Sequence, residues 1–117
     1  MGQPLRAELA RALKGGGAAA RQAEIALGDG PMRQRLSSSI RALAERRGPR
    51  SSICPSDAAR AIGGEGWRDL MGDTYEVAGE LAKDGSVEIT QGGRVLDPDG
   101  EWCGPIRIRS PGGSPRL

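Results

Sequence analysis

The chain has 117 residues, carries a formal net charge of +2 and contains no histidine. Its length leaves room for one domain, and the lack of histidine removes the commonest general base and the commonest zinc ligand. No apolar run is long enough to span a membrane, and the N-terminus has no apolar signal-peptide segment, so we expect a cytoplasmic protein. Leucine, isoleucine and valine together number only 20, so the hydrophobic core must be small.

Residues 1–30 are rich in alanine, glycine and arginine. Leucines at every fourth position from Leu5 to Leu13 indicate a short helix over residues 4–14, which ends at a run of three glycines. An isolated helix of that length is marginal in water. We therefore predict that residues 1–30 form a flexible extension outside the core, and that a chain starting at Met32 folds as stably as the full chain.

An apolar stripe at helical spacing predicts a helix that starts at Met32 and ends before Gly48. The members of the stripe are Leu36, Ile40, Leu43 and Ala44. Residues 51–54 are then expected to be extended, because the proline that follows them disfavours helical backbone at the residue before it. A second helix is expected over residues 56–62, with Ser56 as its N-cap.

A third helix is predicted from residue 66 to residue 84, where apolar residues recur at spacings of three and four. We expect any break in it to fall near Gly72, and we expect Trp67 to be a core anchor between this helix and the sheet. Residues 87–90 and 106–109 are predicted to be two strands, because apolar and polar residues alternate there. The segment between the strands is rich in glycine, proline and aspartate turn pairs.

The order of these elements is helix, short strand, helix, helix, strand, turn and strand, which is that of a winged helix-turn-helix. We therefore expect an α+β domain over residues 31–111, with three helices and a short β-hairpin wing, followed by a disordered tail at 112–117. An unrelated α+β domain with a two-stranded ribbon is the alternative.

Five motifs in this region resemble those of domain of unknown function family 3253, a small bacterial family. The motifs are Ser52–Ala61, Trp67–Met71, Val87–Gly93, Val95–Pro98 and Gly104–Ile108. The resemblance covers residues 32–109 and implies a winged-helix fold, but it implies no activity and no catalytic or binding residues. The chain departs from the family in its long extension before the first helix. It also has Gly72–Tyr75 where a proline and an arginine are expected.

The first functional hypothesis is a nucleic-acid-binding or regulatory module without catalysis. A helix-turn-helix places its second helix in the major groove, while basic side chains contact phosphates. The candidate phosphate-contacting residues are Arg60, Arg68, Arg94, Arg107 and Arg109. Against this hypothesis, residues 65–84 carry six acidic and only two basic residues, and an acidic helix repels DNA. Alternation also requires polar residues on one strand face, so Arg107 and Arg109 could serve that purpose alone.

The second hypothesis is a protein-interaction module that holds its partner with the acidic third helix or the loop around Trp102. Trp102 lies in a polar stretch, and the sequence leaves open whether it packs on the core or is exposed for a partner. We find no nucleophile–base pair, metal-ligand cluster or phosphate loop in the sequence. We therefore expect no catalytic residue, no cofactor, no metal site and no membrane partner.

Cys54 and Cys103 are predicted to remain free thiols, because a reducing compartment disfavours disulfides. Mass spectrometry of protein purified without reductant, with alkylation before and after reduction, checks this prediction. Both thiols should react without prior reduction. A bridge between the two cysteines would contradict the expected compartment.

Overall fold

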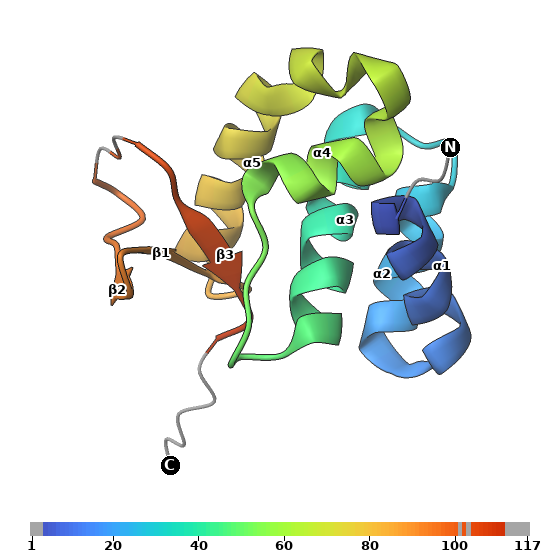
Figure 1. The fold of residues 1–117 in the computed structure, drawn as a ribbon, viewed down its shortest axis with the longest axis horizontal. Helices are drawn as coiled ribbons and strands as arrows, with labels where there is room; N and C mark the ends of the chain where they lie inside the picture. Colours follow the sequence, from blue (N-terminus) through green and yellow to red (C-terminus); the bar gives the residue numbers. More distant parts are fainter. Residues whose placement is uncertain (1–3, 101, 103, 112–117) are drawn as a thin grey trace.

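The computed structural model describes residues 4–100, 102 and 104–111. Its helices pack into one body, and a small antiparallel sheet lies beside this body (Figure 1). The predicted α+β class is therefore confirmed. The tail predicted at 112–117 and the predicted thiol of Cys103 lie outside the described residues.

The N-terminal segment forms two helices, α1 (Pro4–Gly15) and α2 (Gly17–Leu27), which lie side by side (Figure 1). Gly16 and Gly17 join them with φ angles of 76° and 81°, a backbone conformation that favours glycine. Leu9 of α1 is fully buried and belongs to the same core cluster as the rest of the chain. The prediction of a flexible, non-core extension is therefore wrong, although the helix predicted at 4–14 is confirmed.

The prediction for residues 1–30 failed because the buried face of α2 consists of alanine. Ala23 and Ala26 are fully buried, and their small side chains allow α2 to lie close to the next helix, α3 (Met32–Arg47). Arg35 of α3 donates a hydrogen bond from Nε to the carbonyl oxygen of Ala26 at 2.9 Å. The spacing from Ala19 to Ala26 is helical, but alanine adds little contrast to a hydrophobicity pattern.

The central helix of the fold is α3, which contacts α1, α2, α4, α5 and β3. Its four stripe residues are all buried, as predicted. The helix ends at Gly48, whose φ is 81°. The buried hydroxyl of Ser39 donates a hydrogen bond to the carbonyl oxygen of Ala58 at 3.0 Å, so α3 and α4 are joined by a polar contact within the core.

The next helix, α4 (Pro55–Gly63), has Cys54 and not Ser56 as its N-cap. The Asp57 carboxylate accepts the Cys54 backbone N–H at 3.0 Å. Pro55 occupies the first helical position, where a missing N–H costs nothing. Because the N-cap lies two residues earlier than predicted, Ser56 lies inside the helix.

The predicted third helix consists of a 3-10 helix, η1 (Gly64–Leu70), and an α-helix, α5 (Met71–Lys83). The change falls beside Gly72, as expected. Trp67 lies in η1 and is half-buried. It packs against the core cluster but is not one of its buried members, so the predicted core anchor is confirmed only in part. A 3-10 helix turns every three residues, which places Trp67 out of phase with the buried face of α5. That buried face consists of Thr74, Val77, Ala78 and Leu81.

The sheet consists of β1 (Glu88–Gln91), β2 (Arg94–Val95) and β3 (Arg107–Arg109) in the order β2-β1-β3, and both pairings are antiparallel. Gly92 and Gly93 have φ angles of 58° and 85°, as a tight two-residue hairpin turn requires. On β3, Ile108 pairs with Ile89 on one side and forms a bridge with Ile53 on the other. All three isoleucines are buried, so they join the sheet to the helical core.

Leu9→Ala should lower the free energy of unfolding by about 2 to 5 kcal/mol, because truncating a fully buried leucine leaves a cavity. Leu13→Ala is the matched control on the same helix: Leu13 is 42% exposed, and we expect a change within about 0.5 kcal/mol. Urea denaturation followed by circular dichroism measures both. If the two variants are equally stable, α1 does not pack on the core in solution.

Candidate functional site

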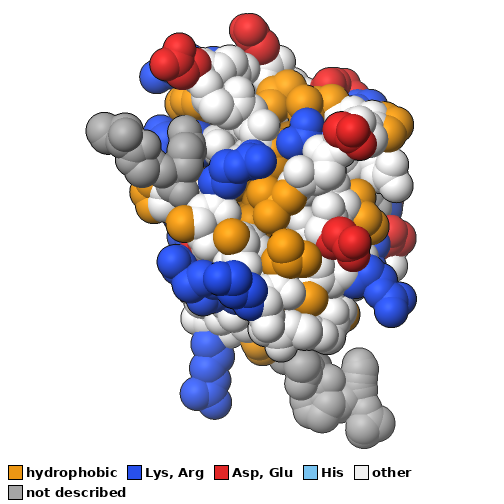
Figure 2. All heavy atoms as spheres, turned by 90° about the vertical axis from the view of Figure 1, so that its right-hand side faces the viewer, with side chains coloured by type: hydrophobic (Ala, Val, Ile, Leu, Met, Phe, Trp, Pro, Cys, Tyr) orange, Lys and Arg blue, Asp and Glu red, His pale blue; other side chains and the backbone are white. Residues whose placement is uncertain are grey.

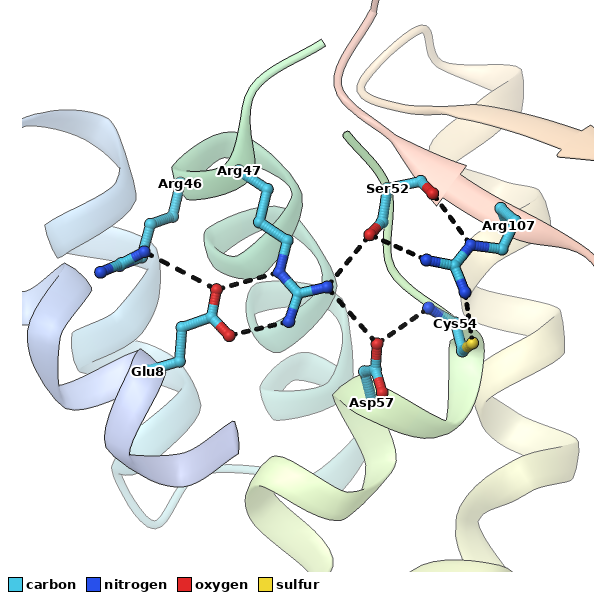
Figure 3. Close-up of polar contacts among 7 residues, drawn as sticks. All are labelled: Glu8, Arg46, Arg47, Ser52, Cys54, Asp57 and Arg107. Atoms are coloured by element: carbon cyan, nitrogen blue, oxygen red, sulfur yellow. Dashed lines mark hydrogen bonds and ion pairs between the residues drawn. The ribbon is translucent and has the colours of Figure 1, made fainter. Parts of the chain in front are cut away.

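Arg107, a predicted phosphate contact, makes three contacts within the protein (Figure 3). Its guanidinium donates hydrogen bonds to the Ser52 carbonyl oxygen at 3.1 Å, to the Ser52 hydroxyl at 2.9 Å and to Cys54 Sγ at 2.8 Å. These bonds tie β3 to the extended segment that leads into α4. A phosphate would therefore have to compete with contacts that stabilise the fold.

The other two strand arginines, Arg109 and Arg94, differ in whether the side chain has a partner. Arg109 donates a hydrogen bond from Nε to Glu88 Oε1 at 3.0 Å, and the two residues are register partners on neighbouring strands. Arg94 is exposed at the start of β2, and its side chain has no hydrogen-bond or ion-pair partner among the described residues. Of the three strand arginines, Arg94 is the one whose side chain makes no hydrogen bond or ion pair among the described residues.

Arg60 and Arg68 are brought together by Trp67. The guanidinium carbon of each lies 4.6 Å from the centre of the Trp67 ring, well inside the range of a cation–π interaction. Both arginines are exposed, and within the described part of the chain neither has a hydrogen-bond or ion-pair partner. Sequence reasoning had selected both arginines, but it had assigned Trp67 to the core.

These three residues line a pocket of about 400 Å³, which we call the η1 pocket. Its complete lining is Pro4, Leu5, Arg60, Gly64, Glu65, Trp67 and Arg68. The first two come from α1, so the N-terminal helix completes a site that otherwise belongs to α4 and η1. Figure 2 views the side of the molecule that carries α1, where exposed apolar surface lies among both basic and acidic side chains.

The acidic side chains of α5 gather around one cation. Arg33 of α3 forms ion pairs with Asp73 at 3.3 Å, with Glu76 at 2.9 Å and with Glu80 at 2.9 Å. The hydrogen bond to Glu76, followed by the charge of Glu80, raises the pKa of Arg33. All four side chains are at least 43% exposed, so each pair contributes little to stability. Three carboxylates against one guanidinium still leave this surface negative.

Trp102 packs against α5, which answers the question that the sequence left open. It is half-buried, it contacts the core cluster, and a Cβ at Gly79 would lie 3.3 Å from its ring. Its indole N–H donates to the carbonyl oxygen of Asp97 at 3.1 Å, and Lys83 of α5 pairs with Asp99 at 3.5 Å. The loop after β2 thus lies against the same helix that carries the acidic side chains.

A buried carboxylate holds α1 to the rest of the protein (Figure 3). Arg47 of α3 donates to Glu8 from Nε at 3.0 Å and from Nη2 at 2.8 Å, and Arg46 lies 3.7 Å away. The hydrogen bonds from Arg47 lower the pKa of Glu8, with smaller contributions from the nearby arginine charges. The same Arg47 also donates to the carbonyl oxygen of Ser52 at 3.0 Å.

Sequence reasoning gave Glu8 no role, although a signal was present. Glu8 lies three residues after Leu5 and four before Ala12 on the apolar face of α1, where an acid must find a cation when the helix packs. Cys54, at the other end of this network, is half-buried and accepts the Arg107 N–H. The Asp57 carboxylate accepts the Cys54 backbone N–H and lies 3.7 Å from Arg47. These contacts hold the fold together, and we assign them no chemical step.

Comparison with known proteins adds a family. A family model described as protein of unknown function (DUF3253) matches residues 33–111, which run from the second residue of α3 to the end of the described chain. No curated protein matches the sequence. The matched range includes Trp67 and the five candidate arginines, whereas Leu5 and Glu8 lie outside it. Among the described helices, none is both long and apolar enough to cross a membrane.

Glu8→Gln should lower the free energy of unfolding at neutral pH by about 1 to 3 kcal/mol, because it weakens charge-assisted hydrogen bonds to Arg47 and leaves that guanidinium only the longer ion pair with Asp57. Glu24→Gln is the matched control, since Glu24 is an exposed glutamate on the neighbouring helix. Chemical denaturation of the three proteins at neutral pH measures the difference.

The stability difference between wild type and Glu8→Gln should also depend on pH. The folded pKa of Glu8 lies below its ordinary value of 4.5, so the ion pair stabilises the fold fully above that value. The stabilisation is lost as the pH falls through the lowered pKa. The stability difference between wild type and Glu8→Gln should therefore shrink as the pH falls below about 4.5. A difference that stays constant down to the acid transition would contradict a charged Glu8–Arg47 pair.

Proposed function

The chain belongs to the DUF3253 family of proteins of unknown function, and we propose that it is a non-catalytic winged-helix module that binds a protein partner. The winged-helix part of the proposal is supported by the order of α3, Ile53, α4, η1 with α5, and the three strands. In that arrangement α4 and α5 correspond to the helix-turn-helix, and β1, β2 and the loop after them correspond to the wing.

One observation carries the choice of a protein partner. In a DNA-binding helix-turn-helix, the helix equivalent to α5 enters the major groove and meets phosphates on either side. Here the exposed side of α5 carries Asp73, Glu76 and Glu80, and the loop with Trp102 packs against the same helix. Carboxylates repel phosphates, and the packed loop occupies space that a groove-binding helix needs.

Binding of nucleic acid through its phosphates is the second candidate function. The observation in its favour is that the side chains of Arg60, Arg68 and Arg94 donate no hydrogen bond to other described residues. Their contacts would fix the protein on a nucleic acid without reading its sequence. The overall charge of +2 gives this candidate little long-range attraction, because nucleic-acid-binding domains carry a basic surface.

Titration against duplex DNA, duplex RNA and single strands at several salt concentrations separates the two functions. We expect no saturable binding at physiological salt, and Glu76→Gln with Glu80→Gln should bring at most a weak, sequence-independent affinity. Saturable wild-type binding whose affinity falls steeply with salt would overturn the proposal. In that case Arg94→Ala should flatten the salt dependence by about 0.9 in log–log slope. It is the cleanest variant because the Arg94 side chain makes no hydrogen bond or ion pair among the described residues.

A further inference from the structure

Two guanidinium groups contact one indole, and neither pairs with a carboxylate within the described part of the chain. Arg60 and Arg68 each lie 4.6 Å from the ring centre of Trp67, so their charges are no more than about 9 Å apart. Elsewhere in the described chain, Arg33, Arg47 and Arg109 are each paired with a carboxylate. The two arginines at Trp67 therefore form a cationic site, and their side chains donate no hydrogen bond to any described residue.

The Trp67 ring prepares both arginines for a carboxylate. A guanidinium held over an aromatic face keeps its planar fork of N–H donors, and this fork matches the two oxygens of a carboxylate. Holding the side chains against the ring also reduces the entropy that they lose when a ligand binds. Two such forks near one another favour an occupant that carries more than one negative charge.

The walls of the η1 pocket show what else the occupant must carry. Pro4, Leu5 and the Trp67 ring give it apolar surface, and its volume is about 400 Å³, enough for an apolar side chain next to an acidic one. Glu65 also lines the pocket and repels any anion beside it, so an occupant whose charges alternate with apolar groups fits better than a continuous row of phosphates.

We propose that the η1 pocket binds an acidic segment of a partner protein, in which carboxylates pair with Arg60 and Arg68 and an apolar side chain packs on Leu5 and Trp67. This inference rests on the proposed function and specifies the partner's chemistry. It also gives the N-terminal helix a role in binding, because α1 supplies Pro4 and Leu5. The acidic surface of α5 lies on other elements and is not part of this site.

The fluorescence of Trp67 can report on the pocket directly. Trp102→Phe leaves Trp67 as the only tryptophan, and this full-length protein is titrated with a short synthetic peptide of alternating glutamate and leucine. We expect a saturable change in emission, which a peptide of alternating glutamine and leucine should not produce. Arg60→Gln and Arg68→Gln together should weaken binding by at least about tenfold, since each loses a charge-assisted fork.

Two control variants test whether the effect is local. Arg94→Gln removes an exposed arginine of the sheet and should leave peptide affinity unchanged. Arg60→Lys with Arg68→Lys keeps both charges but loses the planar forks, so its affinity should lie between those of wild type and the glutamine variant. Circular dichroism and thermal denaturation of each variant confirm that the fold is retained. If Arg94→Gln loses as much peptide affinity as the Arg60 and Arg68 variant, the loss reflects overall charge alone. That result would overturn the assignment of the pocket.

The remaining outcomes separate this inference from the proposed function. If neither the acidic peptide nor any nucleic acid binds, the pocket assignment falls and the proposed function stands. If a single-stranded oligonucleotide binds more tightly than the peptide and the Arg60 and Arg68 variants abolish that binding, the occupant is a phosphate chain. Both proposals then fall together.

Discussion

The ion pair between Glu8 and Arg47 connects parts of the protein that are distant in sequence. Arg47 contacts α1 through Glu8, the segment before α4 through the Ser52 carbonyl, and α4 itself through Asp57. Arg107 contacts that same Ser52 carbonyl from β3. In a chain whose core is small and rich in alanine, such charge-assisted bonds supply orientation that close packing of large side chains supplies elsewhere.

The sequence predicted those elements whose apolar residues contrast with their neighbours. The helix at Met32–Arg47 and the strands around Ile89 and Ile108 satisfy that condition, and each is found. The helix at Gly17–Leu27 fails it, because alanine contributes weakly to any hydrophobic pattern although it packs well between helices. Pattern analysis also assumes a constant helical period, so the 3-10 helix displaced Trp67 from the position predicted for it.

The candidate site was predictable only in part, because sequence identifies charges but not their partners. All five candidate arginines are described, yet Arg107 and Arg109 serve contacts within the sheet region, whereas Arg60 and Arg68 converge on a tryptophan. Arginine suits both purposes, since one planar group can bridge carbonyl oxygens or stack on a ring. The purpose of each arginine depends on contacts with residues that are distant in the sequence. Arg107 and Ser52, for example, are more than fifty residues apart. The role of the five candidate arginines in binding phosphate stays a prediction.

The location of the η1 pocket follows from how the rest of the fold uses its helices. α3 is enclosed on several sides, and α5 is occupied by Arg33 on one side and the Trp102 loop on another. The 3-10 helix between α4 and α5 has no fully buried residue of its own, and its Trp67 and Leu70 only border the core cluster. A half-exposed tryptophan with two uncommitted arginines can persist there because the adjacent α1 supplies an apolar wall. The N-terminal helices therefore contribute to both the stability of the domain and the chemistry of its open surface.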